Sequence, residues 1–539
     1  MAKPKTPNQK RKYGELNKRL AKYVMLVESI YEDLNLEAAK IVGITDFTID
    51  SDRTFMWSDY PQTRKRIRDL QERFVEDIGS VIYSGTSEEW KNSNEVQDLL
   101  ANKVLQTYGV TIGKKNYEIL YQPNNDALKA FQQRKDKGFT ISDKLWNQST
   151  LYKQELEEAI SCAIQKGTSA IILSKQISKY LLDFPQLQKD YRERFGKASR
   201  SMDCEYRSIR LAASEINMAY RQAENLRWQQ MDFVVGYEIK LSNNHTCNGK
   251  PFQDICDILA GKYPKDFQWT GWHPLCRCYK IPILKTEEEF WEWDGRSEAS
   301  TASVNEVKDV PDDFKKWVLD NQERISTAKK RNTLPYFLRD NKSVYQKITV
   351  ESSISEIVKR ASSVGDEVQS TAERIAIKNG GYVTPINFKS TTSITRKVIT
   401  EGITPYDIKD AVRTTIIVPK SRIEDVLEEL HKTEGFLRLK RQKPESFMGY
   451  SGNIVNIRTT NGLTAEIQVN TERMIYAKER PEDAKRILGK KRWEEIHNET
   501  GMEGGLGHKY YEQWRILDKS SNEALKIVEK SIEYYSHFR

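Results

Sequence analysis

Hydrophobic residues recur at three- and four-residue steps through much of residues 10–232, which is the spacing of one buried helix face. The clearest helix is predicted from about Met202 to Met231, a stretch that contains neither Gly nor Pro. Its apolar residues form one stripe: Ile209, Ala212, Ile216, Ala219, Ala223 and Leu226. We expect the charged residues of this helix to face solvent or a partner; they are Arg207, Arg210, Glu215, Arg221 and Glu224.

The pattern changes after residue 232. Residues 233–241 alternate like a strand, and a cysteine-rich segment follows. Residues 295–303 are mostly small and polar, which is typical of a linker. A helix between prolines is predicted within residues 310–342.

The last 190 or so residues alternate helical stretches with short β-rich runs, at Thr414–Pro419, Asn453–Thr459 and Thr464–Val469. This alternation indicates a mixed α/β domain. We therefore predict a multidomain chain in three parts: a mostly α-helical region over 1–232, a small Cys/His-rich α+β part over 233–345, and a mixed α/β domain over 346–539.

Composition narrows the class of protein. A chain of 539 residues with 38% hydrophobic residues can build several packed cores, which excludes a wholly disordered protein. The net charge of +9 permits contact with nucleic acid without requiring it. No run approaches the roughly 18 apolar residues of a membrane span, and the basic amino end lacks the apolar core of a signal peptide. We expect no membrane span and synthesis inside a cell.

Four of the six cysteines fall within 32 residues, beside two histidines. Zinc prefers thiolate and imidazole ligands in a tetrahedron, and crowded cysteines in a reducing compartment favour a structural zinc site. Four ligands are needed, and spacing does not select them from the six candidates His245, Cys247, Cys256, His273, Cys276 and Cys278. The alternative is a set of reduced, buried cysteines with His273 capping a turn.

Lys389, Ser393 and Lys397 follow one another at four-residue steps. On a helix they would share one face, where two ammonium groups flanking a hydroxyl suit polyphosphate oxygens. A solvated basic helix face is the alternative interpretation.

Asp410 stands just before a predicted strand that contains Arg413, and Glu466 and Gln468 alternate with apolar residues on another strand. Two carboxylates on neighbouring strands can hold Mg²⁺, so we expect Asp410 and Glu466 to share one ion. Glu466 could equally be a simple outward-facing strand residue.

Tyr450 lies in a Gly-flanked turn, where its ring can stack on a base or simply fill the turn. His508 starts a predicted helix after a glycine-rich hinge. It can contact phosphate or a substrate hydroxyl, or cap the helix.

The first 345 residues or so resemble the bacteriophage head morphogenesis, or minor capsid, family. The helix over 210–227 with Ala212-Ala213-Ser214-Glu215, the following strand, the Cys pair and the His273–Cys278 box carry this resemblance, together with residues 131–147. It implies a few copies near the portal inside a phage head, with portal and capsid proteins as partners and possibly DNA. The location implied is the virion, and the host cytoplasm during assembly or after delivery.

The order of motifs over residues 360–520 resembles the RelA/SpoT-type nucleotidyltransferase domain, with the Glu466–Thr471 box as the most specific match. The resemblance implies Mg²⁺-dependent transfer of pyrophosphate from ATP to a hydroxyl of a guanosine nucleotide or of a tRNA end. Asn387 and Ile408 stand where the family usually has Arg and the catalytic Asp, and Asp410 takes the place of the latter.

The same resemblance implies a role for each matched residue. Asp410, Glu466, Lys389 and Gln468 are the implied catalytic residues, with Asp410 and Glu466 holding Mg²⁺. The implied nucleotide-binding residues are Lys389, Ser393 and Lys397 along the ATP phosphates, Arg413, Tyr450 on the acceptor base, and His508 at the acceptor.

These observations leave three hypotheses. The chain is a phage minor head protein with an active pyrophosphokinase domain, or a structural minor capsid protein whose C-terminal domain only binds a nucleotide or partner. A metal-dependent nucleic-acid binder that uses the cysteine cluster is the third, and the thin basic flanks of the cluster disfavour it.

Overall fold

The structure is a computed structural model. It describes residues 6–45, 47, 53–163, 169–242, 246–247, 250–251, 253–286, 288–289, 303–443 and 447–539. The chain divides into two compact units, Met1–Tyr345 and Gln346–Arg539. A finer division of the first unit at residue 232 stays a prediction.

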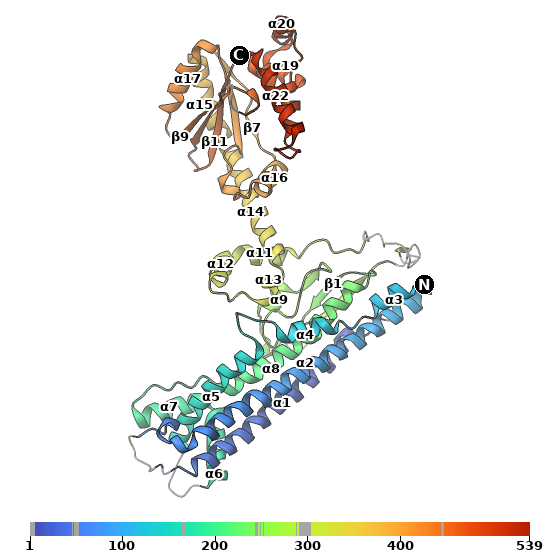
Figure 1. Cartoon of the computed structure of the whole chain (residues 1–539), viewed down its shortest axis with the longest axis vertical. Helices are drawn as coiled ribbons and strands as arrows, with labels where there is room; N and C mark the ends of the chain where they lie inside the picture. The colour runs from blue at the N-terminus through green and yellow to red at the C-terminus, as the bar shows by residue number, and fades with distance from the viewer. Residues whose placement is uncertain are drawn as a thin grey trace. The chain divides into compact units, whose positions relative to one another are not determined.

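The first unit is built mainly from helices, and the long helices α1, α2, α5 and α8 lie side by side (Figure 1). Its first helices are α1 (Gln9–Val42), α2 (Arg64–Tyr108), α3 (Lys114–Leu120), α4 (Asn125–Gln133), α5 (Ile141–Ala163), α6 (Ala170–Leu182), α7 (Phe184–Phe195) and α8 (Cys204–Gln230), with short 3-10 turns η1 (Trp57–Asp59) and η2 (Pro61–Thr63). Their apolar faces meet in one core that includes Tyr31, Phe74 and Leu156. The predicted helical region is thus confirmed.

Helix α8 matches the helix predicted over residues 202–231 to within two residues at its start. Ala212, Ile216, Ala219 and Ala223 of the predicted stripe are buried. We expect the charged residues of this helix to face solvent or a partner, and Arg207 and Arg210 are indeed exposed.

That expectation is wrong for three other charged residues of α8, which are buried because neighbouring elements supply partners. Glu215 bonds to Arg134 at 2.6 Å, and Glu224 lies 3.3 Å from the ammonium of Lys280, which is itself fully buried. Arg221 donates its hydrogen bonds to backbone carbonyls. A charge can be buried when it is paired, so helical periodicity alone misassigns these positions.

A small α+β part follows α8. It contains β1 (Val234–Lys240), β2 (Thr246–Cys247), β3 (Lys250–Pro251), α9 (Ile255–Leu259), β4 (Gly261–Tyr263), β5 (Tyr279–Leu284), α11 (Asp312–Asp320), α12 (Gln322–Lys330) and α13 (Tyr336–Arg339). β1 forms the centre of an antiparallel sheet of order β4-β1-β5. Strand β1 confirms the predicted strand over 233–241.

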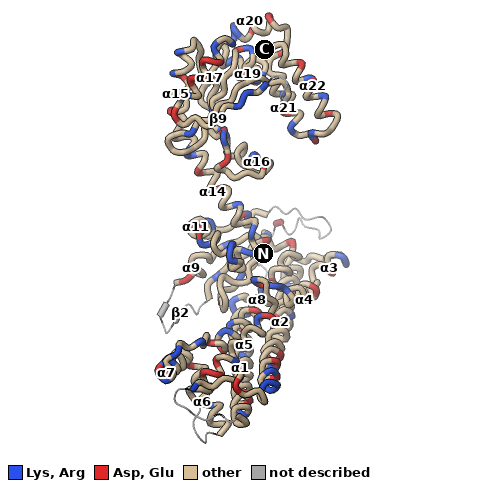
Figure 2. The backbone as a smooth tube through the Cα atoms, turned by 60° about the vertical axis from the view of Figure 1, so that its left-hand side comes forward, with Lys and Arg blue, Asp and Glu red and all other residues tan. Residues whose placement is uncertain are grey.

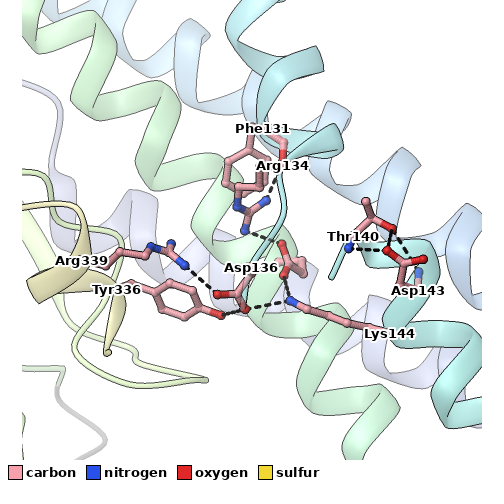
Figure 3. Close-up of polar contacts among 9 residues, drawn as sticks. Phe131, Arg134, Asp136, Thr140, Asp143, Lys144, Tyr336 and Arg339 are labelled. Carbon is pink, nitrogen blue, oxygen red and sulfur yellow. Dashed lines mark hydrogen bonds and ion pairs between the residues drawn. The ribbon is translucent and has the colours of Figure 1, made fainter. Parts of the chain in front are cut away.

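A buried carboxylate ties α13 to the helical part of the first unit (Figure 3). Asp136 bonds to Lys144 at 2.9 Å and to Arg339 at 2.6 Å, and it accepts a hydrogen bond from the Tyr336 hydroxyl. Lys144 also lies 3.6 Å from Glu215 of α8. One acid therefore joins segments about 200 residues apart in sequence.

The second unit is a mixed α/β structure. Its elements are α15 (Gly365–Lys378), β6 (Tyr382–Val383), β7 (Asn387–Phe388), α16 (Thr391–Glu401), η3 (Pro405–Asp407), β8 (Val412–Ile417), η4 (Lys420–Arg422), α17 (Ile423–His431), β9 (Phe436–Arg441), η5 (Phe447–Gly449), β10 (Asn453–Arg458), β11 (Thr464–Asn470), α18 (Glu472–Lys478), α19 (Pro481–Leu488), α20 (Lys490–Thr500), α21 (Leu506–Trp514) and α22 (Asn522–Ser536). Helix α14 (Lys342–Ser363) contains the boundary between the units.

The sheet of the second unit has the order β6-β8-β11-β10-β9, and β7 also pairs with β8. β8 and β11 are parallel neighbours, whereas the other pairs are antiparallel. α15 and α17 lie on one side of the sheet, and α19 and α22 on the other (Figure 1). The core between the sheet and α15 contains Ile416, Val455, Ile467 and Val469, so the alternate residues of these strands face the other side.

The distribution of charged and apolar residues over the structure agrees with what the amino-acid composition predicts. Basic and acidic residues are interspersed along the helices of the first unit (Figure 2). Among the residues that the structure describes, no helix combines the length and the apolar character needed to span a membrane.

Candidate active site and metal centre

A row of polar residues crosses the sheet of the second unit on the face opposite its core. Arg413 of β8 pairs in register with Glu466 of β11, and Glu466 pairs with Asn456 of β10. The row continues to Arg438 of β9 on one side and to Asn387 of β7 on the other. Residues in register on adjacent strands point to the same face, so Glu466 is flanked by polar side chains.

Glu466 and Gln468 lie on one face of β11, as predicted, and their side chains touch. The amide nitrogen of Gln468 donates to Glu466 Oε1 at 2.7 Å. The amide oxygen of Gln468 accepts from the ammonium of Lys478 at 2.8 Å. Lys478 ends α18, and no local spacing pattern connects it with Gln468, ten residues earlier. Sequence reasoning missed it for that reason.

The two lysines of the predicted phosphate site converge on one acid. Lys389 Nζ lies 2.5 Å from Asp410 Oδ2, and Lys397 Nζ lies 3.1 Å from Asp410 Oδ1. Burial raises the pKa of Asp410, but the hydrogen bond and charge of Lys389, with those of Lys397, hold it below its ordinary value. Asp410 is therefore a charged carboxylate that pairs with both ammonium groups and balances one of their two positive charges.

The predicted helical face is only partly correct. Ser393 and Lys397 lie on α16, but Lys389 precedes this helix, because the Ser390 hydroxyl caps it by accepting from Ser393 N–H. The backbone N–H of Lys389 instead donates to Ala411 O at 2.9 Å, which places Lys389 beside the start of β8. The two lysines meet at Asp410 because β7 pairs with β8, and not because of helical spacing.

Asp410 and Glu466 belong to the same end of adjacent parallel strands. Asp410 stands two residues before β8, and Glu466 is the third residue of β11. Carboxylate oxygens are the ligands that Mg²⁺ prefers, so the donor chemistry of this pair fits the ion. Shared coordination of one ion by the two acids stays a prediction.

The ring of Tyr450 is held on several sides. Its hydroxyl exchanges hydrogen bonds with the amide of Asn470, and its ring packs edge-on against Tyr535. Lys478 Nζ lies 5.5 Å from the ring centroid. A Cβ on Gly452 would lie 2.2 Å from the Tyr450 hydroxyl oxygen, so this position requires glycine. Tyr450 is half-buried, and base stacking by its remaining surface stays a prediction.

His508 is the third residue of α21, in agreement with the predicted helix start. Arg480 Nε donates to His508 Nε2 at 3.3 Å. Burial raises the pKa of Glu479, but the nearby charges of Lys478, Arg413 and His508 bring it below its ordinary value. Glu479 thus stands near both Arg413 of the polar row and His508.

The two positions that depart from the family pattern have different surroundings. Ile408 is buried in the core of the second unit, so a carboxylate there would be desolvated. Asn387 lies in β7 beside Arg413. Arg413 is exposed and places a guanidinium on the same polar face.

In the first unit, the structure brings together four of the six candidate zinc ligands. Cys256 Sγ lies 3.8 Å from Cys276 Sγ and 3.1 Å from His273 Nε2. The thiols of Cys256, Cys276 and Cys278 all lie within 4.8 Å of one another. Tetrahedral zinc with sulfur at about 2.3 Å requires sulfurs about 3.8 Å apart, so the three thiols fit zinc. His273 forms a second close group with Cys256 and Asp254, an acid that the sequence did not single out. His245 and the side chain of Cys247 lie outside the described residues.

Helix α8 holds this cysteine box in place through carbonyl oxygens. Arg221 donates to Cys276 O at 2.7 Å and to Cys278 O at 2.8 Å, and Asn217 donates to Cys276 O. Burial raises the pKa of the Cys276 thiol, but hydrogen bonds from Cys256 and Cys278 and the Arg221 charge bring it well below its ordinary value. Hydrogen bonds within the cluster raise the pKa of the Cys256 thiol, and the pKa of the Cys278 thiol is raised as well. Cys276 is thus the thiol of the three that ionises first.

Comparison with known proteins gives one clear sequence match. The chain is 36% identical over 181 residues to the (p)ppApp synthetase toxin Tas1 of Pseudomonas aeruginosa (strain UCBPP-PA14), covering 33% of this chain and 41% of Tas1. The chain thus spans about two fifths of the length of this curated relative. No protein-family model matches the chain.

Two solved structures are also similar. One is a chain of the complex between the Type VI effector Tas1 and its immunity protein, with 36% identity, a TM-score of 0.33, and coverage of 35% of this chain and 97% of that chain. The other is small alarmone synthetase 1 from Bacillus subtilis, with 16% identity, a TM-score of 0.21, and coverage of 34% and 92%. The likeness to Tas1 is thus one of sequence over about a third of this chain. The phage-head resemblance gains no support from these relatives and stays a hypothesis.

Proposed function

We propose that the second unit transfers pyrophosphate from ATP to a hydroxyl of a purine nucleotide. One observation carries the proposal: Lys389 and Lys397 converge on Asp410 just before β8, the strand that pairs with β11, where Glu466 lies in the middle of the polar row. Phosphoryl-group transfer needs cations for the phosphates and carboxylates that orient the nucleophile, and this arrangement supplies both.

Asp410 bonds to both Lys389 and Lys397. When ATP binds, its phosphate oxygens compete for the ammonium groups of Lys389 and Lys397, and the Asp410 carboxylate is released from them. Asp410 and Glu466 would hold Mg²⁺, which neutralises phosphate charge when bound. Glu466, oriented by Gln468, accepts a hydrogen bond and then the proton from the attacking hydroxyl. The hydroxyl oxygen bonds to the β-phosphorus of ATP, the bond from this phosphorus to the α–β bridging oxygen breaks, and AMP leaves.

The acceptor is a nucleotide whose base rests on Tyr450, with His508 at its sugar or phosphate. Tas1 is a (p)ppApp synthetase, and the likeness to it supports an adenosine nucleotide. The RelA/SpoT resemblance supports a guanosine nucleotide, and a tRNA end is a third acceptor class. We propose the nucleotides ahead of tRNA and test all three.

The test uses the full chain with Mg²⁺ and γ-labelled ATP, offered ADP, GDP or tRNA in turn. Label should move to an acceptor, and Glu466→Gln should reduce the transfer at least 100-fold without lowering the unfolding temperature. Glu494→Gln is the matched control, because Glu494 is exposed on α20 and lies 3.9 Å from Lys490 only as a surface pair. A wild-type chain that is inert with all three acceptors would favour the alternative, a binding module without catalysis.

We further propose that the first unit serves in a phage head near the portal, with portal and capsid proteins and possibly DNA as partners. The resemblance of α8 and the His273–Cys278 box supports this, as do the direct contacts between Arg221, Asn217 and the box. Quantitative mass spectrometry of purified phage particles should find a few copies of the chain per particle. Particles that lack it would refute this role.

The Cys256, His273, Cys276 and Cys278 cluster is our proposed structural zinc site. Its thiols are buried, and a closed set of protein ligands is typical of structural zinc. A zinc ion would fix a loop segment that contains little regular structure of its own.

A further inference from the structure

We infer that Lys478 is a positioning residue for the transfer reaction: it fixes the amide of Gln468 so that Gln468 holds the Glu466 carboxylate. The inference rests on the proposed function of this site. It assigns a role to a residue that neither the motif pattern nor the resemblance selects.

The hydrogen bonds of Gln468 permit one orientation of its amide. The ammonium of Lys478 can only donate and an ionised Glu466 carboxylate can only accept. The amide oxygen must therefore face Lys478, at 2.8 Å, and the amide nitrogen must face Glu466, at 2.7 Å. In the flipped orientation two donors would meet at Lys478 and two acceptors at Glu466.

Burial of Gln468 favours this one orientation of its amide. The Gln468 side chain belongs to a residue only 7% exposed, and the Lys478 side chain is 25% exposed. Water has little access to the amide of Gln468, and an unpaired buried amide is costly. Without the ammonium of Lys478, the amide of Gln468 could therefore turn over. Its nitrogen would then no longer hold the carboxylate of Glu466 in one orientation.

Lys478 also connects the hydrogen bonds of Gln468 and Glu466 with other residues of the site. It lies 3.1 Å from Glu479 and 5.5 Å from the ring centroid of Tyr450. A negative group, Glu479, lies on one side of the ammonium, and the neutral amide leading to Glu466 lies on another. The single cation thus lies near Tyr450, proposed for the acceptor base, and reaches Glu466 only through Gln468. Its own position is set by α18.

The experiment compares Lys478→Met, Lys478→Arg and Gln468→Ala in the full chain. Lys490→Met is the control, because Lys490 is 83% exposed on α20. Each variant is assayed for kcat, for KM of ATP and for binding of a fluorescent ATP analogue. Groups that orient a metal-ligating side chain through a hydrogen bond commonly contribute 10- to 100-fold to activity, so Lys478→Met should lower kcat by about that factor. The KM and the analogue affinity should change less than about threefold.

Two comparisons separate positioning from a general structural effect. Lys478→Arg, which keeps a cationic donor, should recover part of the lost kcat. In a Gln468→Ala background, Lys478→Met should cause almost no further loss, because the lysine acts through the amide.

Each other outcome overturns the inference in a recognisable way. Lys478→Met with wild-type kcat, or additive losses in the double variant, would refute the role of Lys478 while leaving the transferase function in place. A wild-type chain without transferase activity would refute both together.

Discussion

Lys389 and Lys397 hold the two oxygens of one carboxylate, Asp410, although Lys389 lies outside the helix that carries Lys397. The two ion pairs place a charged acid where we expect the phosphates of ATP. It also makes the role of Asp410 testable, because an acid that only balances the lysines behaves differently from an acid that takes part in transfer.

Asp410→Asn should abolish transfer by at least 100-fold while ATP binding is retained or strengthened. The reason is that asparagine leaves both ammonium groups free for phosphate but removes the carboxylate. Transfer assays and titration with a fluorescent ATP analogue measure the two effects. Asp425→Asn is the control, since Asp425 forms only an exposed pair with Arg422. Unchanged transfer in Asp410→Asn would show that Asp410 is not catalytic.

Tyr450→Ala should raise the KM for the acceptor nucleotide by roughly 5- to 100-fold, because base stacking contributes about 1–3 kcal/mol. Tyr450→Phe keeps the ring but removes the hydroxyl that bonds to Asn470. We expect Phe to retain most of the acceptor affinity. If both variants leave the acceptor KM unchanged in steady-state assays, the base does not rest on Tyr450.

Purified protein should contain about one zinc per chain by elemental analysis. Replacing both Cys276 and Cys278 by Ser should remove the metal, because three ligands of the proposed four are thiols and two would be lost. Cys162→Ser is the matched control, since Cys162 is half-buried in α5 and outside the cluster. Protein that is fully folded and free of zinc would contradict the assignment.

The stability of the first unit should fall at acid pH through Asp136. Burial raises the pKa of this carboxyl, but the hydrogen bond and charge of Lys144, together with Arg339, bring it below its ordinary value of 3.8. An acid with a lowered pKa in the folded state stabilises the fold above the pKa of the unfolded chain. That contribution is lost as the pH falls through the folded-state pKa.

Asp136→Asn should therefore lower the unfolding free energy at pH 7 by about 2 kcal/mol, because Lys144 and Arg339 lose a shared buried partner. Urea unfolding of wild type and variant should give a difference that shrinks as the pH falls below about 4. A difference that stays constant down to pH 2.5 would exclude Asp136 as its origin.

The local pattern of apolar and polar residues was enough to predict several of the helices and strands. Period-two alternation identified β10 and β11 to within one residue, and it placed Glu466 and Gln468 together on one face. Helical periodicity identified α8. It failed for Glu215, Arg221 and Glu224, because burial of a charge depends on partners such as Arg134 and Lys280 that the helix itself does not contain.

The sequence by itself determined the elements, the two chemical clusters and the residue types in each, because periodicity and short spacing are local properties. Only the tertiary structure decided which of these residues touch. Lys389 reaches Asp410 because β7 pairs with β8, and Arg221 of α8 reaches the carbonyls of the cysteine box. Lys478, at the end of α18, reaches Gln468 of β11. Such contacts depend on how strands and helices pack, and packing brings together residues that no spacing along the chain relates.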